Sequence, residues 1–67
     1  EALQGLTERE RQILDLLVAG LPTAVIARRL QLTPKTVRNR LSEMFAKLGV
    51  RGRSEAVSLA RGVRHDD

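Results

Sequence analysis

The sequence contains no cysteine, tryptophan or tyrosine, and Phe45 is its only aromatic residue. The lack of cysteine excludes disulfide bonds and thiolate metal sites. A single histidine, His65, cannot form a histidine-rich metal site. The scarcity of aromatic rings argues against a stacking surface for single-stranded nucleic acid, which needs several exposed rings. No apolar run approaches the roughly 20 residues that a membrane-spanning helix requires, so we expect no membrane partner.

The length of 67 residues fits one small domain, 1–67, which is too small to enclose a sizeable enzyme cleft in its own core. The sequence shows no nucleophile–base set, metal cluster or glycine-rich phosphate loop. We therefore expect no enzymatic activity, no catalytic residue, no metal and no cofactor. Because the chain begins at Glu1 rather than methionine, we expect it to be a piece of a longer protein.

The basic residues are concentrated in the middle of the chain. Twelve lysines and arginines against eight acids give a net charge of +4. Between Gly20 and Arg53, Glu43 is the only acid. The basic residues of this segment are Arg28, Arg29, Lys35, Arg38, Arg40, Lys47, Arg51 and Arg53. Such a segment is typical of a phosphate-binding surface, although a solvated basic surface without a partner would have the same composition.

Apolar residues recur at helical spacing along the whole chain, which predicts an all-α fold. We expect four helices, at about residues 7–19, 23–30, 34–48 and 54–63, followed by a frayed tail at 64–67. Thr7 and Glu10 match the S/T-x-x-E pattern of a capping box at the start of the first helix. Thr33 followed by Pro34 is an N-cap with proline at the first helical position.

The other helix ends carry simpler signals. Gly20 and Gly49 follow the first and third apolar patterns and terminate those helices. The second helix begins either with Pro22 in its first turn or with Thr23 as its cap. Ser54 is expected to cap the fourth helix.

Only about three residues join the predicted helices 23–30 and 34–48, which indicates a helix-turn-helix arrangement. On a helical wheel, the apolar arc of the longer helix is expected to face the core, and it consists of Val37, Leu41, Met44, Phe45 and Leu48. Its outward first half offers hydrogen-bond donors without an acid, namely Lys35, Thr36, Arg38, Asn39, Arg40 and Ser42. Arginine pairs with guanine and asparagine with adenine in the major groove, while lysine and threonine suit phosphate. An ordinary amphipathic helix with a solvated polar face is the alternative.

Five ordered segments together resemble the LuxR/FixJ/NarL-type helix-turn-helix domain. They are 6–10 (LTERE), 26–30 (IARRL), 35–39 (KTVRN), 48–51 (LGVR) and 54–57 (SEAV), and the resemblance covers about residues 5–62. It implies a four-helix, DNA-binding domain, usually the C-terminal output module of a bacterial transcription regulator such as a response regulator. We accordingly expect double-stranded DNA as the partner and a cytoplasmic location.

The resemblance also implies roles for particular residues. Base edges are expected to be read by Arg38, Asn39 and Ser42. The resemblance implies phosphate contacts for Lys35, Thr36 and Lys47. We further expect Thr23, Arg40 and Arg51 to contact phosphate, although Arg51 and Arg53 could equally remain solvated. The resemblance makes the fourth helix the expected homodimer interface. From the width of its apolar arc we expect Leu59 and Val63 to form that interface, although this helix could instead pack entirely within its own domain. RNA polymerase is a further candidate partner.

Three positions depart from the common family pattern. Val25 stands where glutamate is frequent, which removes a potential partner for the second helix. Arg40 stands where histidine is frequent, and its added charge favours phosphate binding over base choice. Gln31 stands in the turn, where glycine or asparagine is common, and would cost about 1 kcal/mol if its φ is positive.

Two other functions share many of these features. The promoter-reading region of a sigma factor also contains a helix-turn-helix, but the segments 48–51 and 54–57 favour the LuxR-type domain. A protein–protein module could instead use the basic face and the fourth helix to bind an acidic partner.

Overall fold

The computed structural model describes the backbone of residues 3–65 and the side chains of residues 3–62. This part of the chain contains four helices and no strand, which confirms the all-α prediction. The helices are α1 (Glu8–Val18), α2 (Thr23–Leu30), α3 (Pro34–Leu48) and α4 (Arg53–His65). Within the described residues, no helix has the length and apolar character needed to cross a membrane.

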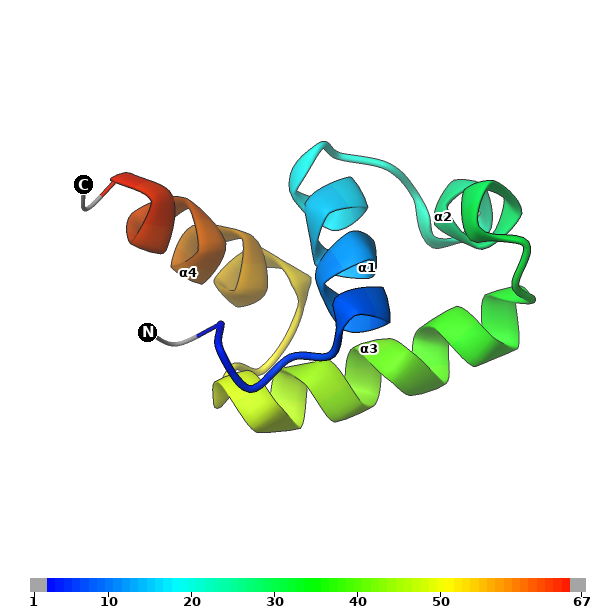
Figure 1. Cartoon of the computed structure of the whole chain (residues 1–67). Coiled ribbons are helices and arrows are strands. Elements are labelled where there is room, and N and C mark those ends of the chain that lie inside the picture. The colour runs from blue at the N-terminus through cyan, green and yellow to red at the C-terminus, as the bar shows by residue number, and fades with distance from the viewer. Residues whose placement is uncertain (1–2, 66–67) are drawn as a thin grey trace.

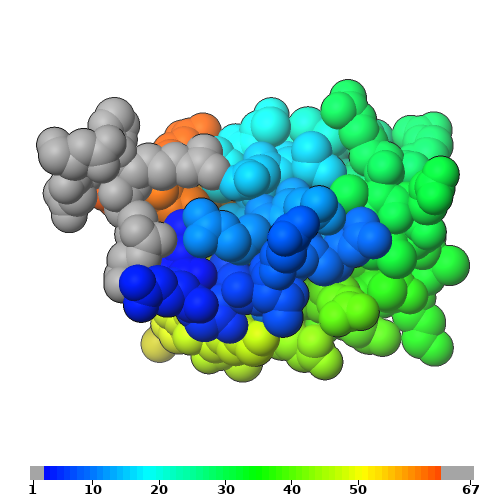
Figure 2. Space-filling model, in the orientation of Figure 1, coloured from blue at the N-terminus to red at the C-terminus, as the bar shows by residue number. Residues whose placement is uncertain are grey.

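The longest helix, α3, runs along one side of the molecule, and the other helices lie above it in Figure 1. α1 stands between α2 and α4, and α2 lies over the first turns of α3 (Figure 1). The N-terminal turn at residues 3–6 rests against the second half of α3, as the space-filling view shows (Figure 2). The first half of α3 therefore packs mainly on α2, while its second half meets α1 and the N-terminal turn.

All four helices and the N-terminal turn contribute to one apolar core. Its buried residues are Leu3, Leu6, Ile13, Leu14, Leu17, Ile26, Ala27, Val37, Leu41, Met44, Ala56 and Ala60. Phe45 and Leu48 are partly buried and pack against this core, so the predicted apolar arc of α3 faces inward. Alanine at positions 27, 56 and 60 leaves room for helices to cross closely.

The local capping predictions at α1 and α3 are confirmed. The Thr7 Oγ1 atom accepts a hydrogen bond from the Glu10 N–H at 3.1 Å, and the Glu10 carboxylate accepts one from the Thr7 N–H at 2.9 Å. At α3, Thr33 Oγ1 accepts a hydrogen bond from the Thr36 N–H at 3.1 Å, and Pro34 is the first helical residue. These bonds satisfy backbone donors that have no partner within the helix itself.

The starts of α2 and α4 differ in detail from the expectation. Pro22 is the N-cap of α2, and Thr23 makes no side-chain capping bond. α4 begins at Arg53, so Ser54 lies inside the first turn instead of capping it. The carboxylate of Glu55 accepts a hydrogen bond from the Arg51 N–H at 2.8 Å just before this helix starts.

The end of α4 also corrects the expectation. The helix continues through His65, two residues beyond the expected end at 63, so residues 64 and 65 belong to the helix. Residues 66–67 lie outside the described residues. Gly62 does not terminate the helix, because a glycine within a helix costs only about 1 kcal/mol and does not by itself break the hydrogen-bond ladder.

Candidate nucleic-acid interface

The turn between α2 and α3 sets the direction of the exposed helix. Gln31 adopts the left-handed conformation, with φ 60° and ψ 41°, and ends α2. The N–H of the next residue, Leu32, donates to the Ala27 carbonyl at 2.8 Å. Ile26 and Val37 are fully buried on the two sides of the turn. The helix-turn-helix is therefore closed by backbone bonds and held by shared core contacts.

The first half of α3 presents the side chains that were predicted to read bases. Arg38, Asn39 and Ser42 are exposed, with Asn39 opposite the buried arc of the helix and Arg38 at its edge. Positions 38 and 42 are four residues apart and 39 lies beside both, so the three occupy one stripe of the helix surface. Their donors and acceptors can therefore reach a ligand that lies along this stripe.

The predicted phosphate contacts of α3 surround this stripe. Lys35 is exposed in the first turn, and Arg40 is exposed on the shoulder of the helix. Thr36 is half-buried, and its Oγ1 atom accepts a hydrogen bond from the Thr33 hydroxyl at 3.0 Å. Among the described residues, no acid forms an ion pair with Lys35, Arg38 or Arg40. The cationic charge of these side chains is therefore available to an anionic ligand.

Two further predicted phosphate contacts lie outside α3. Thr23 is half-buried at the start of α2, and the Arg51 side chain is exposed in the loop after α3. The neighbouring Arg53 has an internal partner, because its guanidinium donates to the Leu21 carbonyl. This bond ties the start of α4 to the segment before α2.

Lys47 differs from the other predicted contacts, because the structure gives its ammonium an internal acid. Nζ lies 2.8 Å from Oε1 of Glu10 and 3.5 Å from the Gly5 carbonyl oxygen. The Lys47 side chain is 43% exposed, whereas that of Glu10 is 2% exposed. Sequence reasoning assigned Glu10 to the capping box and did not foresee this pair, whose members are 37 positions apart.

The surroundings of Glu10 favour its charged form. The hydrogen bond from Lys47 lowers the pKa of the carboxyl most strongly, and the hydrogen bond from the Thr7 N–H lowers it further. Burial acts in the opposite direction, but the net pKa lies below its ordinary value. Glu10 is therefore a buried carboxylate that relies on its partners for compensation.

The predicted dimer face on α4 is only partly described. Leu59 is half-buried, and the side chain of Val63 lies outside the described residues. Ala56 and Ala60 face the core on the other side of the helix. The assignment of Leu59 and Val63 to a dimer interface stays a prediction.

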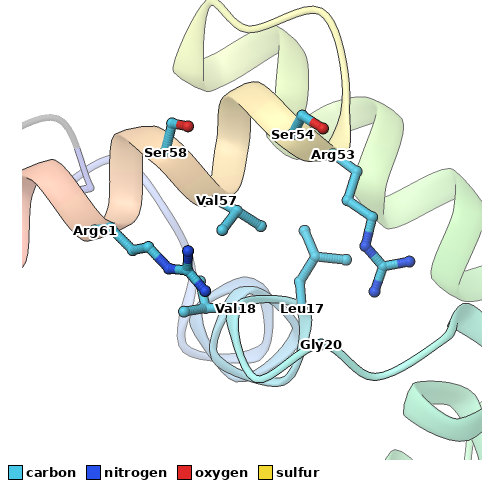
Figure 3. A pocket seen from close by; sticks show the side chains of 8 residues that line it. All are labelled: Leu17, Val18, Gly20, Arg53, Ser54, Val57, Ser58 and Arg61. Atoms are coloured by element: carbon cyan, nitrogen blue, oxygen red, sulfur yellow. The ribbon is translucent and has the colours of Figure 1, made fainter.

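A shallow groove of about 370 Å³ lies between the end of α1 and α4 (Figure 3). Its lining residues are Leu17, Val18, Gly20, Arg53, Ser54, Val57, Ser58 and Arg61. They include no carboxylate, imidazole or thiol, so these side chains do not form a nucleophile–base pair. In the described residues, no three His, Cys, Asp or Glu side chains are grouped so that they could hold a metal ion.

Comparison with known proteins gives a family match over most of the chain. The model of bacterial regulatory proteins, luxR family, matches residues 4–60. The chain is 52% identical over 52 residues to the spore germination protein GerE of Bacillus subtilis (strain 168), covering 78% of the chain and 70% of GerE. This match confirms the resemblance predicted from the five segments, and it does not favour the sigma-factor and protein-module alternatives.

Longer regulators match over a smaller share of their length. The DNA-binding transcriptional activator DevR/DosR of Mycobacterium tuberculosis is 45% identical over 60 residues, which is 90% of the chain and 28% of that protein. The nitrate/nitrite response regulator protein NarL of Escherichia coli (strain K12) is 47% identical over 51 residues, or 76% of the chain and 24% of NarL. The chain thus spans about a quarter of the length of these two relatives.

Proposed function

Because the chain belongs to the luxR family of bacterial regulatory proteins, we propose that it binds specific double-stranded DNA sequences as the output domain of a transcription regulator. The observation that carries this proposal is the exposed first half of α3, the second helix of the helix-turn-helix, which presents donors without an acid directly after the turn. An α-helix about 10–12 Å across fits the major groove, which is about 12 Å wide.

The proposed base-reading residues are Arg38, Asn39 and Ser42. The arginine suits guanine O6 and N7, and the asparagine suits adenine N6 and N7. Ser42, one turn beyond Arg38, can donate to or accept from either kind of base pair. Their common stripe on α3 supports this assignment, because side chains of one stripe follow the same groove.

The proposed phosphate contacts flank the groove. Lys35 and Thr36 stand in the first turn of α3, where the helix dipole also favours an anion. Arg40 on the shoulder, Thr23 at the start of α2 and Arg51 after α3 complete the set. Lys35, Arg40 and Arg51 support these roles, because they are exposed near the reading stripe and no acid among residues 3–62 forms an ion pair with them.

The whole regulator is proposed to be longer and dimeric. DevR/DosR and NarL extend well beyond the region that this chain matches, which supports a longer regulator, and we propose that this chain is its C-terminal output module. Homodimerisation through α4, with Leu59 and Val63, would place two reading helices on related half-sites. RNA polymerase is a further proposed partner, and the bacterial cytoplasm, which contains the chromosome, is the proposed location.

Selection of the 67-residue chain against a library of random DNA duplexes tests the function. We expect sequencing of the bound fraction to show an enriched motif with dyad symmetry. R38A and N39A should each relax the base preference at one base pair and weaken the binding free energy for the enriched duplex by about 1–3 kcal/mol. K35A is the matched control, because loss of a phosphate contact weakens binding to all sequences alike.

Other outcomes would contradict the proposal in distinguishable ways. Salt-sensitive binding to every duplex without enrichment would indicate a nonspecific basic module. No binding to any duplex would favour the alternative in which the basic face binds an acidic protein.

A further inference from the structure

The proposed DNA contacts leave one charged side chain of the core without a role. Among the described residues, Glu10 is the only charged residue that is buried. Its Oε1 atom accepts hydrogen bonds from the Thr7 N–H at 2.9 Å and from Lys47 Nζ at 2.8 Å. The same ammonium lies 3.5 Å from the Gly5 carbonyl oxygen. One cation therefore joins the last turn of α3 to the start of α1 and to the N-terminal turn.

This pairing makes Lys47 a poor phosphate ligand. A buried carboxylate is costly unless an opposite charge and hydrogen bonds compensate it. If Lys47 turned outward to a phosphate, Glu10 would keep only the Thr7 N–H as a partner. The exposed cations Lys35 and Arg40 carry no such penalty, because no described acid forms an ion pair with them.

We propose that Lys47 is a positioning residue that, through Glu10, fixes the tilt of α3 and so places Arg38 and Asn39 for base reading. This inference rests on the DNA-binding function proposed above. α3 has 15 residues and is about 22 Å long. A tilt of about 5° about its C-terminal end would move its first turn by about 2 Å, and base-reading hydrogen bonds do not tolerate that error.

The two roles of Lys47 predict opposite effects of removing Glu10. If Lys47 binds phosphate, E10Q releases its ammonium and should raise the affinity for every duplex. If Lys47 positions α3, E10Q and K47M should both lower the affinity for the enriched duplex. The double variant E10Q/K47M removes one acid and one base, so its net charge stays at +4, as in the unmodified chain.

The experiment measures the dissociation constant of each variant for the enriched duplex and for the unselected library, over a series of salt concentrations. Circular dichroism is first used to choose a temperature at which every variant is folded, and all binding is measured at that temperature. For the double variant we expect a loss of about fivefold or more on the enriched duplex, the lower limit for one lost base contact, with an unchanged salt slope. K47R, which keeps the charge and can reach the carboxylate, should restore most of the affinity.

The outcomes separate the two proposals. K35M is the matched control and should reduce the magnitude of the salt slope by about 0.9, as loss of one phosphate contact predicts. The same reduction in the double variant, or tighter binding by E10Q, would overturn the positioning role while leaving DNA binding intact. If the unmodified chain enriches no duplex, the proposed function itself fails, and this inference fails with it.

Discussion

Gln31 occupies a backbone conformation that its side chain does not favour. At a φ of 60°, the Cβ atom of an L-residue crowds the following carbonyl oxygen and costs about 1–2 kcal/mol. The side chain of Gln31 is exposed, so its packing does not offset this cost. The turn needs the conformation because it lets α3 leave α2 at the angle of the helix-turn-helix.

Replacement of Gln31 by glycine should therefore stabilise the domain. We expect Q31G to raise the free energy of unfolding by about 0.5–1 kcal/mol, since relief of the strain exceeds the added entropy of the unfolded glycine. Urea denaturation measures this change. Q31A retains the Cβ atom and is the matched control, so an equal gain in Q31A would show that the strain is not the cause.

Glu10 should make the stability depend on acid pH. Its pKa is lower in the folded chain than in the unfolded chain, so its contribution is complete above the unfolded value of about 4.3. The contribution is lost as the pH falls through the folded-state pKa. The stability difference between the unmodified chain and E10Q should therefore shrink below about pH 4, because a protonated Glu10 resembles glutamine.

Urea denaturation over a pH series checks this dependence. E8Q is the control, because Glu8 lies in the same first turn but is exposed. If the difference in the free energy of unfolding between the unmodified chain and E10Q stays constant from neutral pH to pH 3, that result would contradict the assigned ion pair.

At the scale of the elements, the two helices of the helix-turn-helix begin differently. α3 has a side-chain cap, with Thr33 Oγ1 accepting the Thr36 N–H at 3.1 Å, whereas α2 follows Pro22 without any side-chain capping bond. The cap defines the first turn of α3, which presents Lys35 and precedes the reading stripe. The Thr33 cap therefore helps to hold the first turn of α3, and with it Lys35, in place for the proposed DNA contacts.

Loss of this cap should destabilise the domain. We expect T33A to lower the free energy of unfolding by about 1 kcal/mol, within the usual range of 0.5–2 kcal/mol. T23A removes a threonine that makes no side-chain capping bond, so it should lower the free energy of unfolding by less. Thermal denaturation compares the two variants, and an equal loss in both would show that the Thr33 hydrogen bond contributes little.

At the scale of the whole molecule, charge is distributed unevenly over the fold. From α2 to the loop after α3, Glu43 is the only acid, whereas α1 carries Glu8, Glu10 and Asp15. This asymmetry favours approach of a polyanion from the side of α2 and α3. Lys47 is paired with Glu10 and is proposed not to add to the charge that this side offers to DNA.

The salt dependence of DNA binding should report that distribution. Three charged contacts per domain, from Lys35, Arg40 and Arg51, predict a slope of log K against log[salt] near −2.7, at about 0.9 per phosphate. A fourth contact from Lys47 would make the slope about −3.6. Titrations of the enriched duplex at several salt concentrations decide between these values, and a flat slope would contradict the electrostatic role of this surface.

Local sequence was enough to predict four helices close to their observed positions and the side-chain caps of α1 and α3, because these features depend on neighbours three or four positions away. The capping box of Thr7, the Thr33–Pro34 start of α3 and the inward arc of α3 were all predictable from periodicity and local hydrogen bonding. The outward arc, which carries the proposed contacts, was predictable for the same reason. Their roles in DNA binding remain proposals.

Which distant side chains meet depends on how the helices cross in three dimensions. The crossing of α1 and α3 brings the ammonium of Lys47 to Glu10, a pair that the position of Lys47 on its helix did not reveal. Arg53 likewise reaches the Leu21 carbonyl once α4 packs on α1. A long, flexible side chain can adopt many rotamers, and its partner depends on the helix crossing, which no local pattern in the sequence records.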